Sequence, residues 1–273
     1  SRSAAATKAT EVKFLIIVLF LRVLPIGNSI AMSLSQLRNC SFLIAEIEKY
    51  LENLPETQNN EKPSQISKIE VRNITKQLEK RNLFENLSLS IYEGSIVGII
   101  GRTGTGKSTL VDVLCGLIKP DSGEINYLDK AGRKVDKPHI NYVDQDTFLF
   151  NGTLAENIEC SPGAKLTHDT LKMLQKFKLD HFLDKEHSTF EMSRISGGER
   201  QRINLLRAFA MGSNVYILDE PMSALDLHTS EIVFNELKRM ASEGSIIFII
   251  THDQSQVPHF DQIITLNKGG AVV

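Results

Sequence analysis

The segment from Ile96 to Leu114 constrains the fold of this chain more than any other. Residues 96–100 (IVGII) form a short apolar run that predicts a buried strand, and residues 110–114 (LVDVL) predict a helix. The residues between them fit the pattern G-x-x-x-x-G-K-[ST]. They are Gly101, Arg102, Thr103, Gly104, Thr105, Gly106, Lys107, Ser108 and Thr109. A strand, this loop and a helix in that order predict a binding site for the phosphates of a nucleoside triphosphate.

The residue types in this loop explain the prediction. Glycines let backbone N–H groups converge on phosphate oxygens without interference from side chains. The following helix N-terminus adds partial positive charge. We expect Lys107 to reach the β- and γ-phosphates and to act in catalysis, and the Ser108 hydroxyl to ligate Mg²⁺.

A second candidate site, which is acidic, follows residues 215–218 (VYIL), and these residues predict another buried strand. Asp219 and Glu220 come directly after it. Acidic residues at the carboxyl end of a strand in this type of fold lie near the phosphates. Asp219 is placed to hold Mg²⁺, and Glu220 to act as the general base that polarises the attacking water.

Residues 68–273 as a whole read as one α/β domain. Further short apolar strands are predicted at 140–143, 245–251 and 262–266, several of them followed by helical stretches. This alternation predicts a largely parallel sheet. The net charge of −2 does not indicate a nucleic-acid partner, and the three cysteines form no CxxC pair that would suggest a disulfide framework or a zinc site.

The N-terminal part of the chain has a different character. Residues 12–24 (VKFLIIVLFLRVL) are strongly apolar, and weaker helix-like spacing continues to residue 54, with a kink expected at Pro25. A helix of this length is about 60 Å long, roughly twice the thickness of a bilayer core. We expect a membrane-crossing helix that continues as a stalk. A lone soluble helix is the alternative, because the apolar run is short and holds Lys13 and Arg22.

A polar segment with two prolines separates these two parts. Residues 55–67 read as a linker by composition. We therefore divide the chain into a helix at 1–54, a linker at 55–67 and the α/β domain at 68–273.

Several further motifs make the α/β domain resemble the ABC ATPases. Residues 195–202 (ISGGERQR) look like the family signature, with Ser196, Gly197 and Gly198 as its turn. Gln145 resembles the Q-loop glutamine, residues 223–226 ending in Asp226 resemble the D-loop, and His252 resembles the switch histidine. These motifs occur in the order found in the family. The resemblance implies a P-loop NTPase fold with an antiparallel β subdomain and a helical subdomain, and ATP with Mg²⁺ as ligands.

The resemblance also implies a role for each of these residues. In the family, the signature of one subunit faces the γ-phosphate that the partner's loop holds. Ser196, Gly197, Gly198 and Asp226 would then serve the nucleotide of a second ABC ATP-binding domain, which we expect to be an identical copy. His252 would contact the γ-phosphate and position water. Gln145 would contact Mg²⁺, take part in catalysis and sense the transmembrane partner.

The segment after Gln145 indicates which kind of ABC protein this is. Residues 149–158 (LFNGTLAENI) resemble members of the exporter type, in which a membrane domain precedes the ATPase. Residues 1–54 then correspond to the C-terminal remnant of that transmembrane domain, and the chain to a piece of a longer protein. The resemblance implies ATP-powered export, with the ATPase on the cytoplasmic side of an inner or plasma membrane.

The chain departs from the family at three places. Leu78 stands where an aromatic residue stacks on adenine, residues 190–194 (FEMSR) replace the usual segment before the signature, and the chain ends soon after a late hairpin at 262–270. Two other functions remain open. One is a non-transport ABC ATPase, which would carry tandem domains or coiled coils. The other is a regulatory nucleotide-binding module, which would have lost residues such as Glu220 or His252.

Overall fold

The structure, a computed structural model, describes most of the predicted ATPase domain. The described residues are 65–78, 81–136, 138–146, 148–160, 164–182, 195–267 and 270–272. The predicted N-terminal helix, most of the linker and residues 190–194 lie outside them. No helix within the described residues has the length and apolar character needed to span a membrane.

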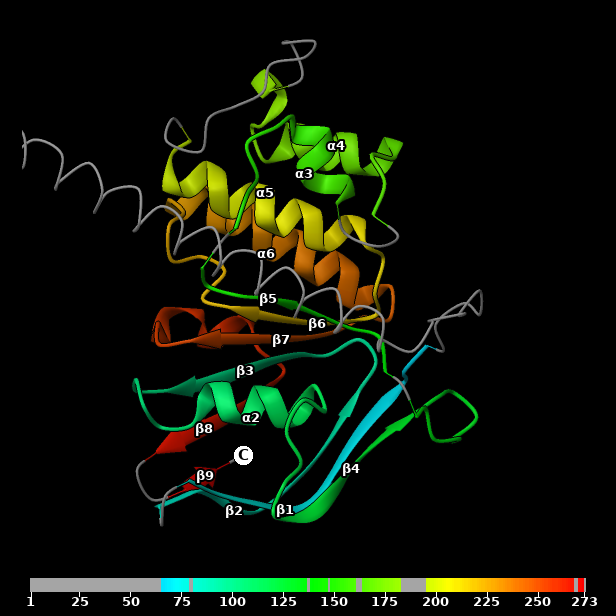
Figure 1. The fold of residues 1–273 in the computed structure, drawn as a ribbon, viewed down its shortest axis with the longest axis vertical. Coiled ribbons are helices and arrows are strands. Elements are labelled where there is room, and N and C mark those ends of the chain that lie inside the picture. The colour runs from blue at the N-terminus through cyan, green and yellow to red at the C-terminus, as the bar shows by residue number, and fades with distance from the viewer. Residues whose placement is uncertain are drawn as a thin grey trace, which may run out of the picture. The chain divides into compact units, whose positions relative to one another are not determined.

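A six-stranded sheet forms the centre of this domain (Figure 1). Neighbouring strands are parallel except for the last pair, β8 and β9. In spatial order the strands are β5 (Ile140–Val143), β6 (Val215–Asp219), β7 (Ile246–Thr251), β3 (Ile96–Gly101), β8 (Gln262–Asn267) and β9 (Gly270–Val272). The strands predicted from apolar runs are all present, and β8 with β9 forms the late hairpin.

A second, three-stranded sheet is antiparallel throughout. Its order is β2 (Arg81–Tyr92), β1 (Lys68–Leu78) and β4 (Ser122–Leu128). This is the predicted antiparallel β subdomain. The two residues that precede β1 also pack against this subdomain. Ile66 is fully buried, and the Ser67 amide donates to the Leu128 carbonyl at 2.8 Å. Packing therefore begins before Lys68, because the apolar Ile66 finds a place in the core.

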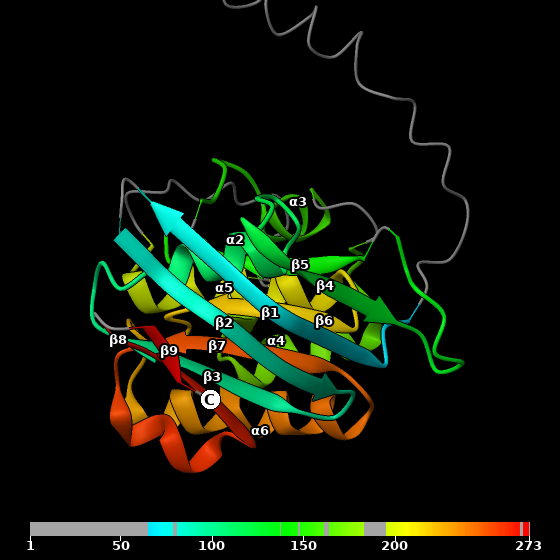
Figure 2. The same cartoon turned by 90° about the horizontal axis from the view of Figure 1, so that it is seen from below.

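The helices cover both faces of the large sheet. The helix α2 (Lys107–Leu114) packs between the two sheets, as Figures 1 and 2 show. The other face carries α5 (Gly197–Ala210) and α6 (Leu227–Ser242), and α3 (Leu154–Glu159) and α4 (His168–Lys176) lie beyond them. The described residues also form the 3₁₀ helices η1 (Asp180–Phe182) and η3 (Gln254–His259). α3, α4 and η1 form the predicted helical subdomain.

Strand β7 illustrates how the sequence builds this layered core. All six of its residues are buried. Ile246, Phe248 and Ile250 belong to the core shared with α2 and the small sheet, whereas Ile247 and Ile249 belong to the core shared with α5 and α6. Successive side chains of a strand point to opposite faces, so a strand covered on both sides is apolar at every position.

The strand pairing brings the predicted site residues to one edge. β7 lies between β3 and β6, and Ile100 pairs with Thr251 while Asp219 pairs with Ile250. The carboxyl ends of these three parallel strands therefore meet. The phosphate-binding loop, the acidic pair and His252 each follow one of them, and ligands of open α/β sheets bind at such an edge.

Candidate functional site

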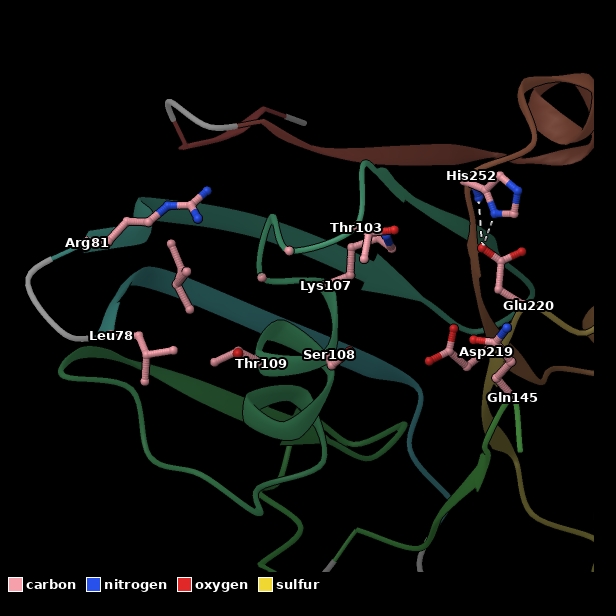
Figure 3. Close-up of a pocket in the computed structure, with 13 residues that line it drawn as sticks. Leu78, Arg81, Thr103, Lys107, Ser108, Thr109, Gln145, Asp219, Glu220 and His252 are labelled. Atoms are coloured by element: carbon pink, nitrogen blue, oxygen red, sulfur yellow. Dashed lines mark hydrogen bonds and ion pairs between the residues drawn. The ribbon is translucent and has the colours of Figure 1, made fainter. Parts of the chain in front are cut away.

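A cleft of about 620 Å³ lies at this edge of the large sheet (Figure 3). It is formed by the loop between β3 and α2, the ends of β5, β6 and β7, and the hairpin of β1 and β2. Its lining residues are Leu78, Arg81, Leu83, Thr103, Gly104, Gly106, Lys107, Ser108, Thr109, Gln145, Asp219, Glu220 and His252.

The phosphate-binding loop reaches α2 through two left-handed glycines. Gly104 and Gly106 have φ angles of +76° and +101°, which side chains rarely tolerate. Gly106 is also the N-cap of α2, so no side chain bonds to the first amides of the helix. A Cβ atom at Gly106 would lie 3.1 Å from the Leu83 side chain. The loop thus presents helix amides to the cleft at a position where a larger residue would crowd Leu83.

Lys107 folds back over its own loop. Its Nζ atom donates to the carbonyl oxygens of Gly101 at 2.7 Å and Arg102 at 3.3 Å. The Thr105 hydroxyl donates to the same Arg102 carbonyl at 2.8 Å. Gly101, Arg102 and Thr105 are not among the lining residues of the cleft, and their hydrogen bonds fix the shape of the loop. The ammonium group can exchange its carbonyl partners for phosphate oxygens, with which it forms stronger, charge-assisted bonds.

Asp219 ends β6 on the opposite side of the cleft. Burial raises the pKa of its carboxyl group, and the hydroxyl of Tyr142, which donates to the carboxylate at 3.3 Å, acts in the opposite direction. Tyr142 comes from the neighbouring strand β5, where it pairs with Ile217. A partly desolvated carboxylate at this position favours binding of a cation.

Glu220 is held in an unusual backbone conformation. Its φ angle is +46°, and its amide donates to the Ile250 carbonyl at 2.9 Å. The amide group of the buried Gln201 side chain donates to the Glu220 and Pro221 carbonyls at 3.5 and 3.2 Å. These bonds compensate for the strain of a left-handed non-glycine residue at the end of a buried strand.

The Glu220 carboxylate lies against His252. Its Oε1 atom is 2.6 Å from His252 Nδ1 and accepts from the His252 amide at 3.1 Å. The hydrogen bond to Glu220 is the main cause that raises the pKa of His252. The carboxylate side chain is 11% exposed, whereas the imidazole is 74% exposed. A largely buried base and an exposed, protonatable ring therefore share one wall of the cleft.

Ser108, Gln145 and Asp219 supply a hydroxyl, an amide carbonyl and a carboxylate to the cleft, with Gln145 beside Asp219 in Figure 3. The described residues contain no group of three or more His, Cys, Asp or Glu side chains suited to a metal. Mg²⁺ uses hard oxygen ligands, commonly one or two carboxylates together with phosphate oxygens and water. This donor set fits Mg²⁺ brought in with a nucleotide.

The predicted signature turn begins α5 and does not line the cleft. Ser196 is the N-cap of this helix, and it forms a capping box with Glu199 in which each bonds to the other's backbone amide. Glu199 also lies 3.1 Å from His181. A Cβ atom at Gly198 would lie 3.0 Å from the Ala224 carbonyl oxygen, so the turn is packed against Ala224.

Asp226 also lies outside the cleft lining. It is the N-cap of α6 and accepts from the Thr229 amide at 2.8 Å and the Thr229 hydroxyl at 2.9 Å. These bonds lower the pKa of Asp226. Within one copy of the chain its carboxylate therefore serves the helix, and its predicted role toward a partner's nucleotide stays a prediction.

Comparison with known families identifies this arrangement. The ABC transporter family model matches residues 84–223, about half of the chain, and this match includes the phosphate-binding loop, Gln145, the signature turn and Asp219. The chain belongs to the ABC transporter family. Its described part is the ATP-binding domain of that family, which binds and hydrolyses ATP, as the sequence predicted.

Individual ABC proteins differ in the transport that their names describe. A spermidine/putrescine import ATP-binding protein, PotA of Spiroplasma citri, is 36% identical over 212 residues, which are 74% of this chain and 59% of that protein. A macrolide export ATP-binding/permease protein, MacB 2 of Yersinia pestis, is 33% identical over 203 residues, which are 68% of this chain and 29% of that protein. The chain thus spans about three fifths of the PotA relative.

The solved structure of a bacterial Atm1-family ABC exporter with ATP bound has the same fold. The TM-score is 0.65 with 23% sequence identity, over 86% of this chain and 44% of the exporter chain. The predicted α/β fold with its parallel sheet and antiparallel subdomain is therefore confirmed.

Three residues of the ABC site were not found from the sequence. Arg81 and Leu83 line the cleft, and Tyr142 contacts Asp219. No motif marks Arg81 or Leu83, because they reach the cleft through the pairing of β1 with β2. Tyr142 could have been found: it lies one residue before the end of a predicted strand that is followed by Gln145.

Proposed function

We propose that this chain is the ATP-hydrolysing part of an exporter-type ABC transporter, in which hydrolysis powers export of a substrate across a membrane. The observation that carries the proposal is the exporter-like segment 149–158. This segment has a defined structure: Thr153 and Glu156 form a capping box at the start of α3. The fully buried Asn157 bonds to both the amide and the carbonyl of Phe150.

The chemistry starts with the triphosphate. The loop amides and the N-terminus of α2 bind its oxygens, and Lys107 leaves the Gly101 and Arg102 carbonyls to pair with the β- and γ-phosphates. Ser108, Gln145 and Asp219 would hold Mg²⁺, which supplies neutralisation of the charge on the phosphate oxygens.

Glu220 then acts as general base. Its carboxylate accepts a proton from the water that attacks the γ-phosphorus, and the bond between that phosphorus and the β,γ-bridging oxygen breaks to release ADP. His252 contacts the γ-phosphate and keeps the carboxylate oriented through the bond to Oε1. Gln145 links the Mg²⁺ ligands to the segment that follows it. The Gln201 side chain donates to the Glu220 and Pro221 carbonyls, and the Glu220 amide donates to the Ile250 carbonyl. These bonds preorganise Glu220 for this role.

The site is completed by a second ABC ATP-binding domain, which we propose to be an identical copy. Ser196, Gly197, Gly198 and Asp226 serve the partner's nucleotide, because none of them lines the cleft of its own chain. Helix α5 has 14 residues, and its N-terminus is suited to binding a phosphate anion. The transmembrane domain is fused ahead of residue 55, and the ATPase lies on the cytoplasmic side of the membrane.

A second candidate function is an ATPase subunit of an importer. The observation that favours it is the 36% identity to a PotA protein, whose name describes import. The two functions differ in how the chain is held at the membrane. The exporter type predicts a membrane helix within residues 12–54, whereas an import ATPase that acts as a separate subunit has no such helix.

Washing membranes with alkaline carbonate separates these possibilities, because it removes peripheral proteins and leaves inserted helices in place. We expect the full chain to stay with the membranes and residues 62–273 alone to be released. The variant Leu19→Arg, which places a charge in the apolar run, should also be released. Complete release of the unaltered chain would contradict the fused-exporter proposal and favour the import subunit.

A further inference from the structure

The end of the cleft that receives the nucleoside differs from the family pattern. Lys107, Asp219, Glu220 and His252 line one end of the cleft, where the proposed function places the γ-phosphate. The nucleoside must then extend toward the other end, where Figure 3 shows Leu78 and Arg81. The aromatic residue expected there is absent, because Leu78 occupies its position.

Leu78 and Arg81 face this end together because they are paired residues of the hairpin of β1 and β2. Leu78 is 58% exposed, and Leu83, a buried residue of β2, lies against Gly106 of the loop. Leucine side chains offer a purine only apolar contact. They cannot replace the face-to-face contact of an aromatic ring.

The guanidinium group of Arg81 can supply that contact. Arg81 is exposed, and no ion pair or hydrogen bond of its side chain occurs among the described residues. Figure 3 shows its side chain extending from β2 along the cleft toward the phosphate-binding loop. A guanidinium is planar and weakly hydrated, and it stacks on the faces of π-systems in a way that an ammonium cannot.

We propose that Arg81 is the base-binding residue of this site, and that its guanidinium stacks on the purine of ATP over an apolar floor of Leu78 and Leu83. This inference rests on ATP binding at the phosphate-binding loop and not on the direction of transport. It assigns to Arg81 the role that an aromatic ring at the Leu78 position has in the family.

Calorimetric titration of the purified chain with ATP and with inorganic tripolyphosphate tests this proposal. Arg81→Ala should weaken ATP binding about fivefold and leave tripolyphosphate binding unchanged, because tripolyphosphate has no base. Arg81→Lys should resemble Arg81→Ala, since lysine keeps the positive charge but lacks the planar guanidinium group that stacks on the base. Arg133→Ala, at an exposed arginine outside the cleft, is the matched control and should bind both ligands normally.

A rescue variant tests the same contact from the other side. Leu78→Tyr restores the aromatic ring, and in this background Arg81→Ala should have little effect on ATP binding. Equal weakening of ATP and tripolyphosphate in Arg81→Ala would overturn the proposal and assign Arg81 to the phosphates. Unchanged ATP binding in Arg81→Ala would also overturn it. Failure of the unaltered chain to bind ATP would contradict the ATP-binding assignment itself.

Discussion

The Nδ1 atom of His252 lies 2.6 Å from Oε1 of Glu220, and the backbone amide of His252 donates to the same oxygen at 3.1 Å. Two adjacent strands, β6 and β7, end one residue before Glu220 and His252, so the contact depends on the register of the sheet. Both contacts are made by the same oxygen, Oε1, and they fix the orientation of the carboxylate. This relationship carries the proposed division of roles, with Glu220 as base and His252 as the group that orients it.

The pair predicts a specific titration of His252. Because the bond to Glu220 raises the pKa of His252, the protonated ring is favoured in the folded chain. The pair's contribution to stability is therefore complete below the ordinary histidine pKa of 6.5 and is lost as the pH rises through the raised pKa. In Glu220→Gln the pKa of His252 should fall toward its ordinary value. Nuclear magnetic resonance of the imidazole measures this, and an unchanged pKa would contradict the contact.

Removal of the Lys107 ammonium should weaken nucleotide binding. Lys107→Ala loses charge-assisted bonds to the phosphates, which corresponds to an increase in the Kd for ATP of at least about tenfold. Titration calorimetry measures the change. Lys238→Ala, at an exposed lysine of α6, is the control and should bind ATP normally. Retention of the original affinity in Lys107→Ala would show that the loop does not bind the phosphates as proposed.

Tyr142 should position Asp219 for Mg²⁺. Its hydroxyl donates to the Asp219 carboxylate at 3.3 Å, and Tyr142→Phe removes that bond with little change in shape. We expect the affinity for Mn²⁺, bound as a spectroscopic substitute for Mg²⁺ in the presence of ATP, to fall about threefold. Affinity for ATP without metal should not change. Tyr92→Phe, at the exposed end of β2, is the control and should bind Mn²⁺ normally. A higher affinity for Mn²⁺ in Tyr142→Phe would refute the positioning role.

Asp226 should stabilise α6 in a pH-dependent way. Its pKa is lowered by bonds from Thr229, so this contribution is present above the ordinary pKa of an aspartate and is lost as the pH falls through the lowered value. Asp226→Ala should reduce the urea midpoint of unfolding at neutral pH, and the difference should disappear in acid. Equal midpoints at neutral pH would argue against the N-cap. ATP binding by a single copy should stay normal.

Much of this site was predictable because its chemistry follows buried strands. The apolar runs before Gly101, Asp219 and His252 predict parallel strands, and parallel strands bring their carboxyl ends to one edge. The position of Leu78 in the cleft was also predictable, from its place in the family pattern.

Other features depend on contacts between distant segments, which no local pattern records. Arg81 and Leu83 enter the cleft only through the register of β1 with β2. Ile66, assigned to a linker by composition, is buried because its apolar side chain joins the core beneath the small sheet. The N-cap role of Asp226 has a local signal, because Thr229 lies three residues later in the first turn of a helix, whereas the resemblance to a D-loop predicts only a role toward the nucleotide.

The most direct test is Mg²⁺-dependent ATP hydrolysis by the purified chain, measured over a range of protein concentrations beside Glu220→Gln. The account predicts a rate per subunit that rises with concentration, because a second copy completes the site. It also predicts that Glu220→Gln lowers the rate at least about 100-fold while ATP binding is kept. Undiminished hydrolysis in Glu220→Gln would contradict the assignment of the base, and a rate per subunit independent of concentration would contradict completion of the site by a second copy.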